Sequence, residues 1–488
     1  MTPSTATTRP APPCAITALD AGALSEAIHA RRLSCREVMQ AYLARIAALN
    51  PGYNAIVSLR PEAELLAEAG ACDAELARGR SRGWMHGMPQ AIKDLANAAG
   101  LPTTLGSPLM KHFVASEDGL MTARMRAAGC IVIGKTNTPE FGLGSHSFNE
   151  VFGTTVNAYD PARAAGGSSG GAAVALALRL LPVADGSDFM GSLRNPAAWN
   201  NIFGFRPSQG RVPMWPAQDV WISQLGTEGP MGRSVRDVAH LLDTQAGWSP
   251  HSPLSIAASA DATRAIGSMD LKKCRIGWLG DLQGYLPMEP GIVPLCEAAL
   301  ARLAGAGAQV APARLGMPPE RVWEAWLVWR RVLVATRIAP FLLKSGNRAQ
   351  VKPEALWEHD QAQQTSGAEF LSASVTRTAF HEQMLKLFET HDFLALPTAQ
   401  VWPFDARERW PGEITGRAMD TYHRWMEVVI YATFAGLPCI SVPAGFGDTG
   451  LPMGLQLIGK PQDDAGVLAL AAAYETLIGD WLGVLPGA

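Results

Sequence analysis

The sequence predicts an α/β protein. Runs of apolar residues at helical spacing alternate along the chain with short runs rich in β-branched residues, which is typical of helices packed on a sheet. Apolar residues make up 48% of the 488 residues and charged residues 17%, a globular composition. The chain is long enough to bury a large core, and it shows no internal repeat.

The N-terminal part is expected to begin with helices. Residues 23–49 carry apolar side chains at helical spacing and should form two helices, with Ser34 as the N-cap of the second and Pro51 and Gly52 at its end. Further helices are expected over 62–78 and 120–129, and strands over 87–95 and 130–133.

The alternation continues toward the C-terminus, where Ser234 is expected to cap a helix that ends near Ala246. Strands are expected at 275–278, 393–396 and 439–442, and helices at 290–305, 319–340, 369–390 and 464–478. Trp323, Trp326 and Trp329 share one side of their helix, where they either pack in the core or line a pocket.

Composition excludes several classes of partner. The net charge of −3 gives no reason to expect binding to nucleic acid or to an anionic membrane, and no apolar run reaches the ~18 residues of a membrane span. The seven cysteines are scattered without metal-ligand spacing, which favours reduced thiols in the cytoplasm. Residues 1–14 are expected to be a flexible tail.

Two glycine-rich motifs match known patterns but lack their context. Gly129 to Thr136 fits a P-loop, yet its four middle residues form an apolar strand that cannot wrap a triphosphate. Gly167 to Gly171 fits a nucleophile elbow around Ser169, but a loop precedes it where the elbow needs a strand.

A lysine and two serines offer a third arrangement. Ser168 and Ser192 lie in two Gly/Ser-rich turns, and a serine hydroxyl needs a base before it becomes a good nucleophile. Lys93, in an apolar run, can be that base if burial lowers its pKa. The alternative is that Lys93 pairs with Asp94 or extends to water.

The order of these and other blocks resembles the amidase signature family. The blocks are Gly166–Gly171, Gly186–Arg194, the run Gly87–Asp94 around Lys93, Gly134–Gly142, Gly229–Met231, Gly436–Gly445 and Gly450–Gly459. The resemblance extends over residues 23–478 and implies an α/β/α sandwich around one large, mixed, mainly parallel sheet. It implies a single domain over 15–488, with core motifs at 85–235 and 391–478 and a variable, pocket-forming region at 248–390.

The resemblance also implies catalytic roles. Ser192 would be the nucleophile. Ser168, preceded by a cis peptide bond, would relay a proton between Ser192 and Lys93. Lys93 would be the final base. The backbone N–H groups of Phe189, Met190, Gly191 and Ser192 would form the oxyanion hole. Ser169, Asp188 and Arg194 would support the site.

The implied reaction is hydrolysis of a small-molecule amide without metal or organic cofactor. Met190 departs from the family's usual Gly and Phe189 from its usual Thr or Ile, which leaves the backbone donors intact unless position 190 needs a positive φ. Near-neutral charge and many Trp and Met residues favour a neutral, partly apolar amide, carbamate or cyclic amide. Residues 422–431 and the tryptophan helix are the expected pocket walls. A homodimer is one expected state.

Two other functions share this fold. The chain could be the glutamine-hydrolysing subunit of a tRNA-dependent amidotransferase, which needs partner subunits and a route for ammonia. A glutamine site also needs charged groups for the substrate's own charges, and the sequence identifies none. It could also be a catalytically inactive binding protein, which the intact triad positions argue against.

Overall fold

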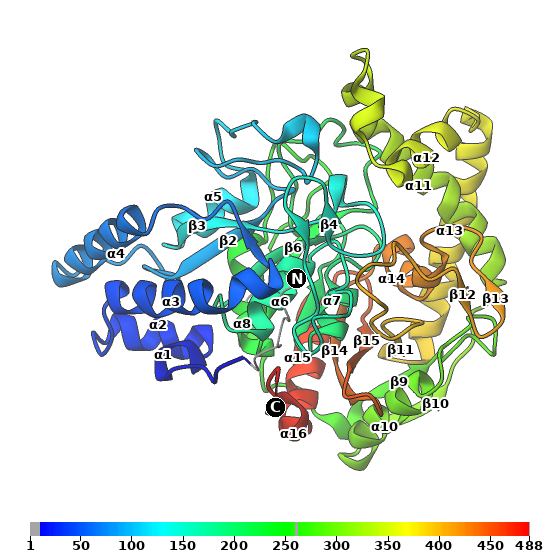
Figure 1. The fold of residues 1–488 in the computed structure, drawn as a ribbon. Helices are drawn as coiled ribbons and strands as arrows, with labels where there is room; N and C mark the ends of the chain where they lie inside the picture. The colour runs from blue at the N-terminus through cyan, green and yellow to red at the C-terminus, as the bar shows by residue number, and fades with distance from the viewer. Residues whose placement is uncertain (1–9, 259–261, 488) are drawn as a thin grey trace, which may run out of the picture.

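The computed structural model describes residues 10–258 and 262–487. The tail expected over 1–14 lies mostly outside these residues. Residues 10–14 have no regular secondary structure, and the Arg45 side chain donates to the carbonyl groups of Ala11 and Pro12 at 3.1 and 3.3 Å. Figure 1 shows helices α1 to α4 at one side of the molecule and α11 to α13 at the opposite side.

An eight-stranded sheet forms the centre of the fold. Its order is β10 (Gln309–Pro312), β9 (Arg275–Trp278), β11 (Phe393–Pro397), β15 (Pro452–Ile458), β14 (Cys439–Phe446), β7 (Phe203–Arg206), β8 (Thr227–Gly232) and β6 (Ala184–Asp188). A smaller sheet has the order β1 (Ile56–Val57), β3 (Ile131–Thr136) and β2 (Pro89–Lys93). The backbone N–H of Lys93 in β2 donates to the Asp185 carboxylate in β6 at 3.0 Å, which links the two sheets.

The prediction of a mixed sheet is confirmed, but the expectation that it is mainly parallel needs correction. Strands β10, β9 and β11 run parallel, whereas every neighbouring pair from β11 across to β6 is antiparallel. One reason is the tight turn between β14 and β15, where Gly447 N–H donates to the Leu451 carbonyl at 3.0 Å. A hairpin makes its strands antiparallel, which alternation of helices and strands alone does not reveal.

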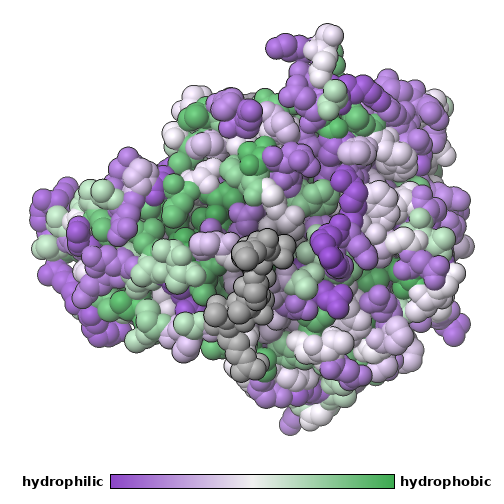
Figure 2. Space-filling model, viewed as in Figure 1, coloured by the Kyte–Doolittle hydropathy of each residue, from purple (hydrophilic) through white to green (hydrophobic). Residues whose placement is uncertain are grey.

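Helices cover both faces of the large sheet, as the α/β/α prediction requires. Alternate residues of β11 point to opposite faces: Leu394 and Leu396 pack with α11 (Pro319–Leu342), α13 (Gly367–Thr390) and α14 (Ile430–Phe434). Phe393 and Ala395 pack on the other face with α8 (Val235–Gln245), α10 (Ile292–Gly305) and α15 (Asp464–Glu475). Figure 2 shows the molecule from the same side as Figure 1, and hydrophilic residues predominate along its outline.

The remaining helices surround this sandwich. They are α1 (Ala15–Ala18), α2 (Ala21–His29), α3 (Cys35–Tyr53), α4 (Glu62–Ala77), α5 (Leu120–Ala127), α6 (Gly170–Ala177), α7 (Arg194–Trp199), α9 (Ala262–Ala265), α12 (Pro353–Ala362) and α16 (Gly479–Leu482). Two-residue strands pair as β4 (Phe148–Asn149) with β5 (Gly153–Thr154) and as β12 (Glu413–Ile414) with β13 (Arg417–Ala418).

Local signals placed most helix ends correctly. The side chains of Ser34 and Ser234 accept backbone N–H bonds as N-caps of α3 and α8. Helix α3 nevertheless continues through Pro51 to Tyr53, so the predicted end was wrong. Asn54, with φ of 52°, ends the helix in the left-handed conformation that asparagine tolerates.

Candidate active site

Lys93 lies at the end of β2 and is 1% exposed. Its Nζ lies 2.8 Å from Ser168 Oγ, 2.7 Å from Ser169 Oγ and 3.0 Å from Ser187 Oγ. Burial lowers the pKa of Lys93 to about 7, against the opposing negative charges of Asp185 and Asp188. Neutral and protonated Lys93 therefore coexist near pH 7, as a group that accepts and returns a proton must allow.

Ser168 and Ser169 lie in the turn before α6. The Gly167–Ser168 peptide bond is cis, which confirms the expectation for this bond. Ser169 directly precedes α6, but its hydroxyl does not cap the helix. It accepts instead from the backbone N–H of Ser187 at 3.3 Å and from Lys93. Ser169 thus links β6 with Lys93.

Ser192 lies in the turn between β6 and α7, and it is half-buried. Its carbonyl accepts from the Ser169 N–H at 3.3 Å, which joins the two serine turns. Among the described residues its hydroxyl has no hydrogen-bond partner, and Ser192 lines the same cavity as Lys93 and Ser168. The structure therefore gathers all three predicted residues at one cavity.

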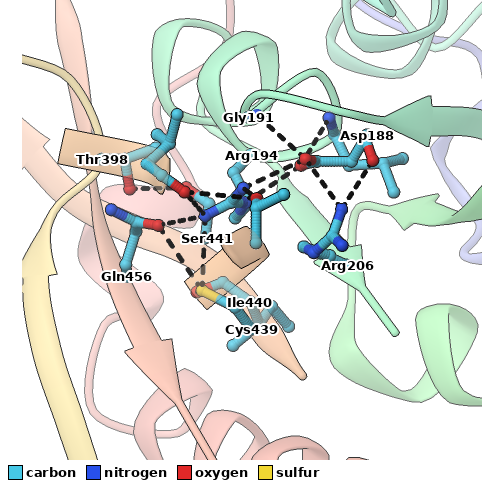
Figure 3. Close-up of polar contacts among 12 residues, drawn as sticks. Asp188, Gly191, Arg194, Arg206, Thr398, Cys439, Ile440, Ser441 and Gln456 are labelled. Atoms are coloured by element: carbon cyan, nitrogen blue, oxygen red, sulfur yellow. Dashed lines mark hydrogen bonds and ion pairs between the residues drawn. The ribbon is translucent and has the colours of Figure 1, made fainter. Parts of the chain in front are cut away.

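Asp188 shapes the Ser192 turn from within. Its carboxylate accepts from the N–H groups of Gly191 at 2.9 Å and Leu193 at 3.2 Å, and Figure 3 shows it between Arg194 and Arg206. Burial would raise the pKa of Asp188, but the two guanidinium groups hold it well below its usual range. Asp188 is therefore a permanent anion that organises the turn.

Arg194 ties this turn to the far side of the sheet. Its Nε and Nη2 donate to the Asp188 carboxylate, and its Nη1 donates to Gln456 Oε1 at 2.6 Å, as Figure 3 shows. It also donates to the Val429 carbonyl at 2.9 Å and to Thr433 Oγ1 at 2.8 Å. Arg194 thus connects the Ser192 turn with β15 and α14.

The four predicted oxyanion donors do not have equal surroundings. The N–H of Gly191 already donates to Asp188, while Met190 has no positive φ, so a side chain at that position is tolerated. Gly191 has φ of 79°, and a Cβ there would lie 2.8 Å from a Val429 methyl group. Glycine is thus required at 191 and not at 190.

A cavity lies beside the serines. Its apolar lining includes Met121, Phe141, Phe189, Met190, Met214, Val334 and Met426. Its charged lining is Lys93, Asp185, Asp188, Glu228, Arg330 and Arg337. The cavity therefore offers both apolar and polar contacts to a small molecule.

A family model described as amidase matches residues 37–468. The chain belongs to the amidase signature family. It is 34% identical to a glutamyl-tRNA(Gln) amidotransferase subunit of Thermosynechococcus vestitus over 465 residues, 91% of this chain and 94% of that protein. It is 31% identical to an acylamidase of Rhodococcus erythropolis over 462 residues, 94% and 95% of the two chains.

A solved bacterial aryl acylamidase of the same family superposes on this amidase with a TM-score of 0.88. The two are 30% identical, and the match covers 95% of this chain and 97% of that one. The family and these relatives identify the protein as an enzyme, an amide hydrolase. None of the described helices is long and apolar enough to cross a membrane, and no group of three His, Cys, Asp or Glu side chains within 10–258 and 262–487 could hold a metal ion.

The tryptophan helix of this amidase forms a pocket wall, but not through its tryptophans. Trp323, Trp326 and Trp329 are buried in the core, so their role is packing. The wall comes from later turns of α11, through Arg330, Val334 and Arg337. Of the expected wall at 422–431, Met426 lines the cavity.

The structure decides whether Asp94 pairs with Lys93, which the sequence left open. Lys135, the lysine of the P-loop match, is buried with its Nζ on the Ala96 carbonyl and 3.9 Å from Asp94. Asp94 therefore pairs with Lys135 and not with Lys93. Sequence reasoning missed Ser187, whose hydroxyl contacts Lys93; its only signal was its place five residues before Ser192 in the same Gly/Ser-rich stretch.

Proposed function

We propose that this amidase cleaves the C–N bond of an amide through Ser192, Ser168 and Lys93. The observation that carries the proposal is the buried Lys93 Nζ at 2.8 Å from Ser168 Oγ, with a pKa of about 7, in the cavity lined by Ser192. Lys93 accepts a proton from Ser168 as Ser168 takes the proton of Ser192. The Ser192 oxygen then attacks the carbonyl carbon.

The proton then moves along the same relay in the opposite direction. Protonated Lys93 returns its proton through Ser168 to the leaving nitrogen, and the amine departs from an acyl-enzyme on Ser192. Water then attacks the acyl group and gives its proton to the relay, which frees the acid. The N–H groups of Phe189, Met190 and Ser192 stabilise the oxyanion. Gly191 contributes less, because Asp188 accepts its N–H.

The substrate we propose is an amide with apolar groups beside the scissile bond. Phe189, Met190 and Met426 line the cavity around Ser192, and related proteins named acylamidase and aryl acylamidase support this class. Carbamates and cyclic amides would suit the same chemistry. We place the reaction in the cytoplasm, because all seven cysteines are unpaired and all but Cys14 are buried.

Labelling tests the assignment of the nucleophile. Phenylmethanesulfonyl fluoride should modify Ser192, and peptide mapping by mass spectrometry should locate the adduct. Ser192→Ala should abolish both labelling and turnover, whereas Ser268→Ala, at an exposed serine outside the cavity, should change neither. Label on Ser169 in place of Ser192 would contradict the assignment, and no label with no turnover would favour a non-catalytic binding protein.

Glutamine hydrolysis within an amidotransferase is a second candidate. It is favoured by the relatives named as glutamyl-tRNA(Gln) amidotransferase subunits. It is also favoured by Arg330 and Arg337, because they bring to the cavity the charged groups for glutamine that the sequence alone did not identify. Release of ammonia from glutamine and co-purification of a stoichiometric partner would support it.

Light scattering of the purified protein tests the expected homodimer in the same preparation.

A further inference from the structure

Two cavities meet beside Ser192. The inner cavity described above adjoins an outer one, which is lined largely by residues 209–224 and 333–341. The two share Leu95, Phe141, Leu143, Phe189, Met214, Gly226, Val334 and Arg337. A substrate long enough to extend from Ser192 into the outer cavity must pass these residues, of which Arg337 alone is charged.

Arg337 has no counter-ion among the residues that the structure describes. Its side chain is exposed, and it makes no hydrogen bond or ion pair with any residue in 10–258 or 262–487. The other arginine of the inner cavity differs, because Arg330 Nε lies 2.6 Å from Glu358 and Arg330 Nη2 donates to Tyr422 at 2.7 Å.

The acids of the two cavities do not compensate Arg337. Asp188 is neutralised by Arg194 and Arg206, and Asp185 accepts from Gln90 Nε2 and from the Lys93 backbone N–H. In the outer cavity, Asp219 accepts backbone N–H bonds from residues 221–223 of its own loop.

Glu228 is the remaining acid of the inner cavity. Burial and the nearby Asp185 raise its pKa to about 8, so it is mainly protonated at pH 7. None of the described acids that line the two cavities therefore balances the positive charge of Arg337 in the space where the substrate binds.

We propose that Arg337 binds a carboxylate of the substrate, so that the preferred substrate is an amide with one carboxylate remote from the scissile bond. The inference rests on the proposed function, and it replaces the uncharged substrate expected from composition with a mono-anionic one. A guanidinium group matches a carboxylate through two parallel hydrogen bonds. Glutamine fits less well, because its ammonium group finds no free carboxylate beside Arg337 at pH 7.

Matched amides test the preference. Glutaric acid mono(4-nitroanilide) and pentanoic acid 4-nitroanilide differ only by a carboxylate on the acyl side. N-pentanoyl-4-aminobenzoate and N-pentanoylaniline differ in the same way on the amine side. We expect a kcat/KM at least tenfold higher for the charged member of one pair, an effect typical of a charge-assisted hydrogen bond. Equal values in both pairs, or faster turnover of glutamine, would overturn the inference.

Variants assign the preference to one side chain. Arg337→Gln should bring the charged-to-neutral ratio close to one, and Arg337→Lys should keep part of it because it retains the charge. Arg321→Gln, exposed on the same helix and outside both cavities, should leave the ratio unchanged. The charge of Arg337 also lowers the pKa of Lys93, so Arg337→Gln should move the acid limb of the pH profile upward. A ratio that survives Arg337→Gln would contradict the assignment.

Labelling separates this inference from the proposed function. 4-(Fluorosulfonyl)benzoate should label wild-type Ser192 at least tenfold faster than benzenesulfonyl fluoride, and this measurement needs neither turnover nor a variant. Equal rates would overturn the role of Arg337 while leaving Ser192 as the nucleophile. If neither reagent labels Ser192, the proposed function fails and the inference fails with it.

Discussion

The lowered pKa of Lys93 has a consequence for stability that can be measured apart from catalysis. A lysine in the unfolded chain has a pKa of 10.5, and burial lowers that of Lys93 to about 7 in the folded protein. Between these values the unfolded chain binds a proton that the folded protein lacks. The free energy of unfolding should therefore rise with pH in this window, and below pH 7 the cost of burying the charge is fully present.

The size of the effect follows from the same two pKa values. At 1.36 kcal/mol for each pH unit, the full window corresponds to roughly 5 kcal/mol. Between pH 7 and pH 9, wild type should gain about 2 kcal/mol relative to Lys93→Met, which has no titrating group at this position. Lys93→Met should be inactive, because it lacks the proposed base. Its stability relative to wild type should be highest at pH 7 and below.

Urea unfolding followed by tryptophan fluorescence measures this difference at pH 6, 7, 8 and 9. Lys386→Met, at an exposed position of α13, is the matched control and should follow the pH dependence of wild type. The kcat/KM of wild type should rise through pH 7 to a plateau, because neutral Lys93 is the base. If the gap between wild type and Lys93→Met stays constant from pH 7 to pH 9, the reasoning about burial is refuted.

Three further substitutions test the site. Gly191→Ala should lose most activity, because the φ of 79° disfavours a side chain and a Cβ would lie 2.8 Å from a Val429 methyl group. Adding Val429→Ala to this variant should restore part of the rate. No restoration would count against the steric explanation. Arg194→Met should lower the free energy of unfolding by about 3–5 kcal/mol, because it leaves the buried Asp188 carboxylate short of a partner. Urea unfolding measures this change, and a value near zero would contradict the role of Arg194. Ser168→Ala should reduce kcat about 10²–10⁴-fold and Ser169→Ala distinctly less; equal losses in stopped assays would argue against separate roles.

Local physical chemistry made several features readable from the sequence. Ser34 and Ser234 indicated the helices that they cap, because a cap depends on residues three positions away. The ordered glycine and serine blocks identified the family and pointed to Lys93, Ser168 and Ser192, which the fold brings to one cavity.

Other features depend on contacts between distant residues, and only the tertiary structure decided them. The direction of most strands, the packing of the tryptophans of α11 in the core and the use of the Gly191 N–H by Asp188 leave no local pattern. Arg337 is the clearest case. In the sequence it is one of many arginines. Its lack of a counter-ion among the described residues emerges only when helix α11 packs beside Ser192 and the acids that line the two cavities are engaged elsewhere or protonated.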